Sequence, residues 1–445
     1  MRNERALIGI RSLLLLAVVA WPFTGAWAGT PQEQVLYRFA GGSDGAQPNN
    51  GLIADSAGNL YGTTSEGGGA GCGGIGCGIA FELSPQQGGG WTETILHIFK
   101  GGKDGAVPDA PLVADAAGNL YGTTSEGGSD TCGLASGCGA VFELSPRKRG
   151  WKEKILYSFD AKSKSDRNAN IQPPELVISD VWAPNGLVFG SDGNLYGFAF
   201  LGGRCDVMGF LVACYGGAFE LKKPSKRDAQ WRESVIYRAK NLLTGRPEGP
   251  PVFDTSGNLY GLEVGANYGS VFALQPPADK GKWRPSTLYT FQGGDDGGYL
   301  APGLAFDANG NLYGATTGYQ SLPGNVFELT PGKNGAWTET PLYTFANAAN
   351  GNSPTAAPVL GGDGNIYGMT SAGGQSNLGV VYELSPQNGS WNETVLYSFS
   401  GGSEGATPQG TLLASSGTFY GVTLAGGNGG CYNNAGCGTV FALIP

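Results

Sequence analysis

Charged residues are scarce in this sequence, and histidine is nearly absent. Asp, Glu, Lys and Arg make up only 14% of the 445 residues, the formal net charge is −9, and His97 is the single histidine. The chain has no long basic cluster, and an acidic surface argues against nucleic acid and anionic lipid as partners. One histidine is also too few for the usual zinc sites, in which four Cys and His ligands converge.

Long apolar runs are absent after the first residues of the chain. Residues 1–11 carry three Arg, residues 12–21 are a short apolar run, and Ala26-Trp27-Ala28 follows. This order is typical of a secretory signal peptide, here residues 1–28, cut after Ala28. The apolar run is too short for a comfortable membrane span. We therefore expect a secreted mature chain, extracellular or periplasmic, without a membrane span.

No segment shows the 3.6-residue apolar period and the capping residues of a helix, which excludes helical solenoids. Glycine, by contrast, is abundant, with 79 residues. Such a content without a collagen period often indicates disorder. Here, however, the glycines stand at fixed places between regular apolar runs, as turn residues do. We therefore expect an ordered chain of strands and turns.

One stretch, Asp55-Ser-Ala-Gly-Asn-Leu-Tyr-Gly-Thr-Thr64, returns along the whole chain. Its later copies are spaced by about 53 residues, and a fixed period of this size is the signature of a repeat architecture. The seven copies are marked by Tyr61, Tyr121, Tyr196, Tyr260, Tyr313, Tyr367 and Tyr420.

Each repeat is expected to form four strands. In the first, residues 51–55 and 60–64 flank a turn typical of a hairpin. Residues 78–85 are a third run that ends at a proline, and residues 91–99 alternate apolar and polar side chains with strand period. Seven such units predict an all-β fold, a seven-bladed β-propeller of four-stranded blades. Tyr and Trp that recur at one strand position are expected to pack within the blades rather than to stack on sugars.

The two ends of the propeller complement each other. The last unit lacks a fourth strand, whereas residues 34–39 match a fourth strand without a blade. Pairing these segments removes two free strand edges. We therefore expect one propeller over residues 29–445, with a ring closed by the N-terminal strand and a seventh blade made from residues 34–39 and 411–445.

The unit Leu-Tyr-x-Phe, Gly-Gly-x-Asp-Gly-Ala-x-Pro, Gly-Asn-Leu-Tyr-Gly-Thr-Thr, Gly-x-Val-Phe-Glu-Leu-x-Pro covers nearly all of residues 34–445. It resembles the GloVer tandem repeat of bacterial extracellular (choice-of-anchor) β-propeller proteins. The resemblance implies an exported protein and no established enzymatic activity. Members often carry a C-terminal sorting anchor, which we do not expect here. Asn-Leu-Tyr-Gly is also similar, over a short length, to hairpins of NHL and gluconolactonase-type propellers.

The eight cysteines fall into four close pairs, and each pair occupies the same place in its repeat. An exported chain reaches an oxidising compartment, which favours disulfides over metal binding. The expected bridges are Cys72–Cys77, Cys132–Cys138, Cys205–Cys214 and Cys431–Cys437.

Acidic residues recur in the loops between the last strand of one unit and the first strand of the next. A ring of such carboxylates could bind Ca²⁺ or assist acid–base chemistry. Because Asp before Gly commonly caps a turn, and because a catalytic pair should break the symmetry, we favour a role in the turns. We expect no metal and no cofactor, with Ca²⁺ as the open alternative. The acids are Asp44, Asp104, Asp296 and Glu404.

Catalytic signatures are missing. No P-loop, HExxH, EF-hand or GxSxG motif occurs at a credible place. His97 stands where other repeats have a tyrosine, which disfavours a Ser-His-Asp triad built on it. We assign no catalytic residue.

Two loops break the repeat, residues 160–185 and residues 201–217. Both are expected on the face where the longer loops meet. Long loops in a compact frame often carry function, although neutral insertion is the alternative. Trp182 is the one mature tryptophan outside the repeat position, and we expect it to be an exposed anchor. The candidate ligand-binding residues are Trp182, Asp180, Arg204, Asp206 and Phe210.

These observations favour a secreted, non-catalytic propeller that binds an extracellular glycan or protein through its loop face. The alternatives are a polysaccharide hydrolase or lyase and a lactonase-like metal enzyme. Two or three non-repeated acids that converge in the mouth of the channel would favour an enzyme.

Overall fold

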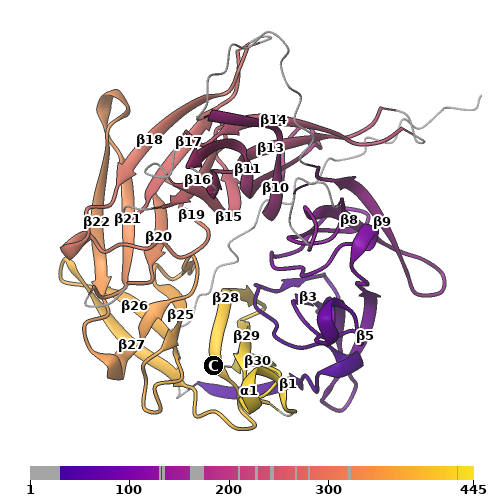
Figure 1. Ribbon diagram of the computed structural model, residues 1–445. Helices are drawn as coiled ribbons and strands as arrows, with labels where there is room; N and C mark the ends of the chain where they lie inside the picture. The colour runs from indigo at the N-terminus through magenta and orange to yellow at the C-terminus, as the bar shows by residue number, and fades with distance from the viewer. Residues whose placement is uncertain are drawn as a thin grey trace, which may run out of the picture.

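The chain forms seven antiparallel sheets arranged in a ring, as the computed structural model shows (Figure 1). Each sheet contains a four-stranded blade, and two of the sheets have one additional short strand. The seven-bladed β-propeller expected from the sequence is confirmed. The structure describes residues 31–129, 132, 136–160, 175–208, 211–225, 229–240, 245–265, 268–278, 281–318, 322–427 and 429–444.

The first and second strands of each blade form a hairpin around the recurring Asn-Leu-Tyr-Gly motif. The first strands are β2 (Ile53–Ala54), β6 (Val113–Ala114), β10 (Glu175–Phe189), β15 (Arg246–Phe253), β19 (Ala305–Phe306), β23 (Asn352–Pro354) with β24 (Val359–Leu360), and β28 (Ala406–Ser415). The second strands are β3 (Leu60–Thr64), β7 (Leu120–Thr124), β11 (Leu195–Met208), β16 (Leu259–Val264), β20 (Leu312–Thr316), β25 (Ile366–Ala372) and β29 (Thr418–Ala425).

The third and fourth strands complete each blade. The third strands are β4 (Ile79–Pro85), β8 (Ala140–Pro146), β13 (Gly217–Lys222), β17 (Ser270–Gln275), β21 (Asn325–Pro331), β26 (Val380–Gln387) and β30 (Thr439–Ile444). The fourth strands are β5 (Trp91–Ile98), β9 (Trp151–Ser158), β14 (Arg232–Arg238), β18 (Arg284–Thr290), β22 (Trp337–Thr344), β27 (Ser390–Ser398) and β1 (Gln32–Arg38). Strand β12 (Leu211–Cys214) pairs with β11, and helix α1 spans Cys431–Asn434.

The turn between the first two strands explains why its motif recurs. The Asp55 carboxylate accepts hydrogen bonds from the backbone N–H groups of Ala57 and Asn59 at 2.9 and 3.0 Å. Its second oxygen accepts the hydroxyl of Tyr61 at 3.1 Å. The Asp therefore fixes the turn while the Tyr ties the returning strand to it, which is how an Asx turn joins two strands.

Aromatic side chains join neighbouring blades. Phe99, after strand β5, meets Phe142 of the next blade edge-on, with ring centroids 5.1 Å apart. Tyr61 meets Trp151 of the next blade edge-on at 6.1 Å. Edge-to-face pairs at such distances add stability beyond the area that they bury. These Tyr and Trp side chains thus take part in the packing of the blades, as expected, although the contact lies between two blades rather than within one.

One junction departs from this pattern. Ala239 stands where other repeats have the phenylalanine that follows the fourth strand. Phe198 of strand β11 is fully buried, and the centroid of its ring lies 5.5 Å from that of Phe272 in the next blade. Gly261 makes room for it, because a Cβ atom at that position would lie 2.1 Å from the Phe198 ring. The volume lost at Ala239 is therefore supplied by a different strand.

The two ends of the ring meet in one sheet. Strand β1 pairs antiparallel with β30, and Val35 lies opposite Phe441. Figure 1 shows β1 in indigo beside the yellow strands β28, β29 and β30. Closure by the N-terminal strand is confirmed.

Candidate functional site

One face of the ring, here called the loop face, carries the loops from fourth to first strands and from second to third strands. Backbone bridges between Ala46 and Glu66 link the two kinds of loop within a blade. The loop face also carries the disulfides, which are confirmed at Cys72–Cys77, Cys132–Cys138, Cys205–Cys214 and Cys431–Cys437.

The recurring loop acids serve as acceptors for their own turns. The Asp104 carboxylate accepts the backbone N–H of Lys100 at 2.9 Å. The Asp296 carboxylate accepts the backbone N–H of Gln292 at 2.8 Å and the hydroxyl of Tyr289 at 3.0 Å. The acids thus stabilise the short turns that lead into the next blade, in line with the structural role that we favoured for them.

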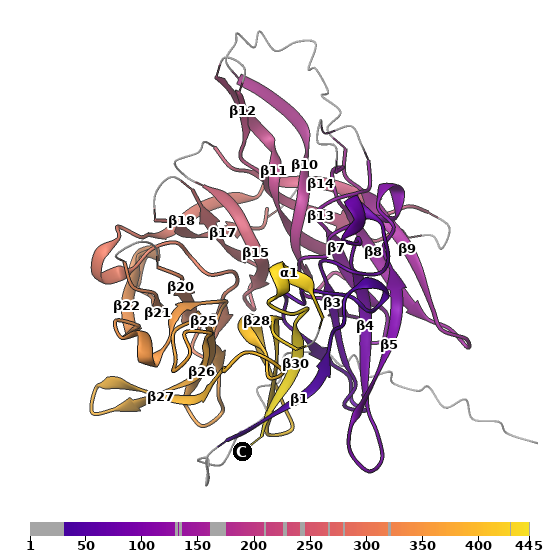
Figure 2. The same ribbon diagram turned by 60° about the horizontal axis from the view of Figure 1, so that its bottom comes forward.

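The described parts of the two segments expected to be loops, residues 175–185, 201–208 and 211–217, are largely strands. Residues 175–189 form β10 and residues 195–208 form β11, and their backbones pair with Glu175 opposite Asp206. With β12 they make a ribbon that extends beyond the other blades on the loop face (Figure 2). Extended segments that exchange backbone hydrogen bonds are strands whatever their loop-like composition.

The expectation that Trp182 is an exposed anchor is wrong. Its side chain lies in strand β10, is 6% exposed and packs in a core cluster with Cys138 and Phe159. The indole nitrogen is buried and has no hydrogen-bond partner among the described residues. The side chains of Asp180, Arg204 and Asp206, and the whole of Phe210, lie outside the described residues, so their role as ligand-binding residues stays a prediction.

Trp182 is buried because it belongs to the repeat after all. Ala183 has a positive φ of 55°, close to the 57° of Gln47. The backbone N–H of Ala183 donates to the Cys138 carbonyl at 2.9 Å, as that of Gln47 donates to the Cys437 carbonyl at 2.9 Å. Trp182 therefore occupies the blade junction where the first repeat has the alanine before Gln47.

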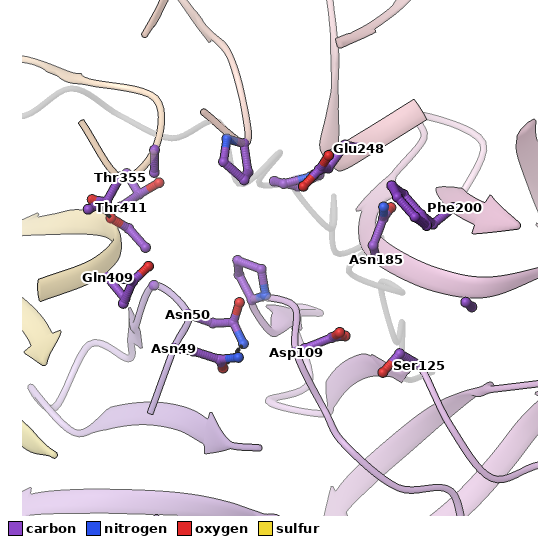
Figure 3. Close-up of a pocket in the computed structure, with 18 residues that line it drawn as sticks. Asn49, Asn50, Asp109, Ser125, Asn185, Phe200, Glu248, Thr355, Gln409 and Thr411 are labelled. Carbon is purple, nitrogen blue, oxygen red and sulfur yellow. Dashed lines mark hydrogen bonds between the residues drawn. The ribbon is translucent and has the colours of Figure 1, made fainter. Parts of the chain in front are cut away.

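A ring of non-identical polar side chains surrounds the channel at the loop face. In six blades, one residue directly follows the recurring proline at the end of the fourth-to-first loop and lines a central cavity of about 430 Å³. In the remaining blade the equivalent residue is the buried Ala301. Most of the ring is visible in Figure 3. Its members are Asn49, Asp109, Asn185, Glu248, Thr355 and Gln409.

Two acids of this ring influence each other. Burial is the main cause that raises the pKa of Asp109 to about 7. Hydrogen bonds from the Ser125 side chain and from its own backbone N–H oppose this shift, while the charges of Glu126 and Glu248 add to it. Burial raises the pKa of Glu248 as well. Near neutral pH, Asp109 can therefore act either as a proton donor or as an acceptor.

Two residues of the ring carry an oxygen atom without a hydrogen-bond partner in the described part of the chain. Oδ1 of Asp109 and Oδ1 of Asn185 are buried and have no partner among the described residues. The Asn185 amide donates to the Pro247 carbonyl at 3.2 Å, which holds the side chain in place. Phe200 adds a half-buried aromatic ring to the cavity wall, with the Arg246 guanidinium 4.8 Å from its centroid. Such a mixture of fixed polar atoms and an apolar wall suits a small polar ligand.

Sequence reasoning missed this ring. The signal was present, because in six repeats the proline is constant while the residue after it changes. A position that varies within an otherwise uniform repeat is not needed for the fold itself. Asp109 and Glu248 are two non-repeated acids in the channel mouth, the feature that we expected of an enzyme.

Among the described residues, no helix is long and apolar enough to cross a membrane. Several solved structures resemble this one. The extracellular domain of a protein described as a one-component system from B. thetaiotaomicron matches with a TM-score of 0.51 and 11% identity over 93% of this chain, which spans 41% of that chain. This likeness shows the propeller fold alone.

Two enzymes align with lower TM-scores. A luciferin-regenerating enzyme gives 0.43, with 11% identity over 93% of this chain and 95% of its own. A PQQ-bound aldose sugar dehydrogenase from Streptomyces coelicolor gives 0.40, with 12% identity over 93% of this chain and 98% of its own. No curated protein matches the sequence.

A family model supplies the remaining comparison. The Gloeobacter/Verrucomicrobia repeat matches residues 26–178 and 320–445, more than half of the chain. Both matched regions contain the Asn-Leu-Tyr-Gly or Asn-Ile-Tyr-Gly hairpins around which the blades are built. The chain therefore belongs to the Gloeobacter/Verrucomicrobia repeat family, which confirms the resemblance found in its sequence.

Proposed function

We propose that this protein is exported and binds a polyhydroxylated ligand, the end of an extracellular glycan, in the mouth of its central channel. A glycan is one of the two partners expected from the sequence, the other being a protein. Its site, however, moves from the ribbon of β10 and β11 to the channel.

The observation that carries this proposal is the polar ring after the recurring prolines. The ring residues share one backbone position but belong to five side-chain types, so the blades present an asymmetric set of donors and acceptors to the same cavity. An asymmetric set of donors and acceptors recognises one orientation of one ligand, whereas a symmetric set does not. The unpartnered oxygens of Asp109 and Asn185 offer acceptors to ligand hydroxyl groups.

The charge and shape of the cavity narrow the ligand class. Asp109 and Glu248 bring acidic character, which repels uronates and phosphates and favours neutral or amino sugars. The Phe200 ring can cover the apolar face of a sugar, as an aromatic wall commonly does. The volume of about 430 Å³ suits one or two sugar units rather than a long chain.

Two features support export. The first 28 residues have the pattern of a signal peptide. The described chain has four disulfides, and such bonds persist in oxidising compartments.

The test is calorimetric titration of the mature chain, residues 29–445, with a panel of neutral, amino and acidic oligosaccharides. We expect Asn185→Ala and Glu248→Gln to lower affinity for the best neutral or amino sugar by about tenfold or more. The matched control is Arg204→Ala in the ribbon, which should bind as wild type does. The opposite result, with binding lost only in Arg204→Ala, would assign the site to the ribbon.

A second candidate function, glycan hydrolysis or elimination, is favoured by the presence of Asp109 and Glu248 in one cavity. Burial raises the pKa of both carboxyl groups, that of Asp109 to about 7, which suits a group that donates or accepts a proton near neutral pH. The same oligosaccharide panel, assayed for released products, distinguishes the two. If wild type releases products and Asp109→Asn still binds the sugar but releases none, the protein is an enzyme. If wild type binds a sugar and releases no product, the protein is a binding protein.

A further inference from the structure

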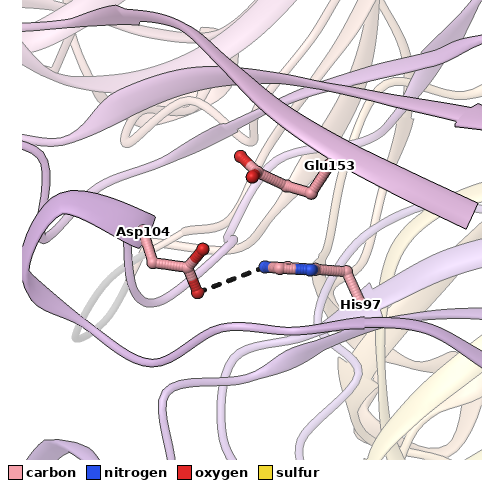
Figure 4. A group of neighbouring side chains, drawn as sticks. All are labelled: His97, Asp104 and Glu153. Carbon is pink, nitrogen blue, oxygen red and sulfur yellow. Dashed lines mark hydrogen bonds and ion pairs between the residues drawn. The ribbon is translucent and has the colours of Figure 1, made fainter.

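Outside the channel, one blade junction brings together three side chains that can coordinate a metal. His97 lies on strand β5 of the first blade, Asp104 ends the short 3₁₀ turn in the loop that follows it, and Glu153 lies on strand β9 of the second blade. One potential ligand atom from each residue lies within 4.8 Å of the other two. Figure 4 shows the three side chains facing one another, with His97 Nε2 at 3.2 Å from Asp104 Oδ2.

The same junction in other blades carries a tyrosine in place of His97. Tyr289 donates its hydroxyl to Asp296 at 3.0 Å, and Tyr397 donates to Glu404 at 3.0 Å. Burial is the main cause that raises the pKa of Tyr289 to about 12, so the phenol keeps its proton at neutral pH. A protonated phenol donates one hydrogen bond to a neighbouring carboxylate and is a poor metal ligand.

Histidine changes the chemistry of this junction. An imidazole presents a nitrogen lone pair, which is the commonest metal ligand in proteins. Oε1 of Glu153 is buried and has no partner among the described residues, and the same holds for Oε1 of Glu339 at the Tyr289 junction. A neutral imidazole and a phenol each have a single proton to give and cannot satisfy two acids, but the imidazole alone adds a strong metal ligand. A cation among the three groups would compensate both carboxylates.

We propose that His97, Asp104 and Glu153 bind a divalent transition metal ion, such as Zn²⁺, that links the first blade to the second. Zn²⁺ accepts imidazole nitrogen and carboxylate oxygen together, and three protein ligands leave a fourth position for water. Ca²⁺ and Mg²⁺ take oxygen ligands almost entirely, so they do not suit the imidazole. The proposal revises the sequence-based expectation of no metal and is independent of the channel ligand.

The test uses the untagged mature chain with its disulfides intact, stripped with a chelator and titrated with Zn²⁺ alone by calorimetry. Wild type is expected to bind one ion per chain. His97→Tyr restores the residue that the other blades have, so the fold should persist while affinity falls by about 100-fold or more. Glu153→Gln keeps the shape of the side chain, and its affinity for Zn²⁺ should be about tenfold or more below that of wild type.

A gain-of-site variant makes the result decisive. Tyr289→His places an imidazole beside Asp296 and near Glu339, the same pair of groups at another junction. It should raise the stoichiometry from one ion to two. Equal Zn²⁺ affinity in wild type and His97→Tyr, or no binding by wild type at millimolar Zn²⁺, would overturn the proposal. Melting temperature with and without Zn²⁺ provides a second readout, because an ion held only by the folded state raises it.

Discussion

Phe39 meets Phe81 edge-on, with ring centroids 5.2 Å apart, across the junction where the ring closes. Phe39 follows strand β1, which belongs to the last blade by its hydrogen bonds, whereas Phe81 lies on β4 of the first blade. Both side chains are fully buried. The closing junction is therefore packed like the others, although it joins opposite ends of the chain.

Replacing Phe39 by Ala is expected to cost about 3–5 kcal/mol of unfolding free energy, because it removes a fully buried aromatic ring and leaves a cavity. Denaturation with guanidinium, followed by tryptophan fluorescence, measures the loss. The matched control is Phe99→Ala, which removes the equivalent ring at the next junction and should cost a similar amount. A change below about 1 kcal/mol for Phe39→Ala alone would mean that the ring is not closed in solution.

Trp182→Ala is expected to act on stability. Because Trp182 is 6% exposed and packs against core residues, its loss should destabilise the protein by about 3–5 kcal/mol. Trp182→Phe, which keeps most of the volume, should cost much less. Unfolding free energies of the three proteins provide the comparison. If Trp182→Ala keeps the stability of wild type but loses affinity for the glycan, Trp182 is the surface anchor that was first expected.

Reduction of the four disulfides is expected to loosen the loop face while the blades persist. Each bridge closes a short loop, since the two cysteines of a pair are 5, 6, 9 and 6 positions apart in the sequence. Loops of this length correspond to about 2–3 kcal/mol per bridge. The melting temperature should fall on addition of a reductant. The far-ultraviolet circular dichroism spectrum, recorded at about 20 °C, should keep its strand signal. Loss of that signal on reduction would contradict the expectation.

The raised pKa of Asp109 predicts a pH-dependent stability. The folded protein holds this proton to about pH 7, whereas the ordinary value is 3.8, so the folded state binds the proton more tightly. The resulting stabilisation is complete below about pH 4 and is lost as the pH rises through about 7. Asp109→Asn cannot ionise, so it should melt about 2–4 °C above wild type at pH 8.

The same comparison at pH 4 is the control, because both side chains are then neutral and the difference should nearly vanish. A difference that is the same at pH 4 and pH 8 would mean that the channel does not raise the pKa of Asp109. Ser125 and Glu248, which act on this carboxyl group, remain unchanged in both proteins.

Much of the fold could be predicted from local patterns. Tyr61 and its counterparts recur because, in five blades, this tyrosine bonds the Asp of its own turn and packs against an aromatic ring of the next blade, so counting them counts the blades. The position of β1 followed from the missing strand of the last unit. Trp182 was misplaced because the repeat there has lost its glycines, which hid the agreement of Trp182-Ala183-Pro184 with Ala46-Gln47-Pro48.

The candidate sites are harder to predict because they join residues from different repeats. Asp109 and Glu248 meet only when the ring brings their blades around one channel, and no spacing in the sequence expresses that distance. His97 was identified as a substitute for tyrosine, and that identification agrees with the structure. Its neighbour Glu153 comes from the following repeat, where it reads as the polar face of a strand.

The pairing of β1 with β30 also sets an order of events during folding. Val35 is among the first residues of the described chain and its partner Phe441 among the last, so the ring cannot close until nearly the whole chain has been synthesised. Contacts so distant in sequence form slowly, since the entropy of closing the loop opposes them. Meanwhile β1 and the incomplete last blade present unpaired edges, which are templates for association with a second chain. Chains that stop before β30 should therefore aggregate, whereas the folded ring offers no such edge at this junction.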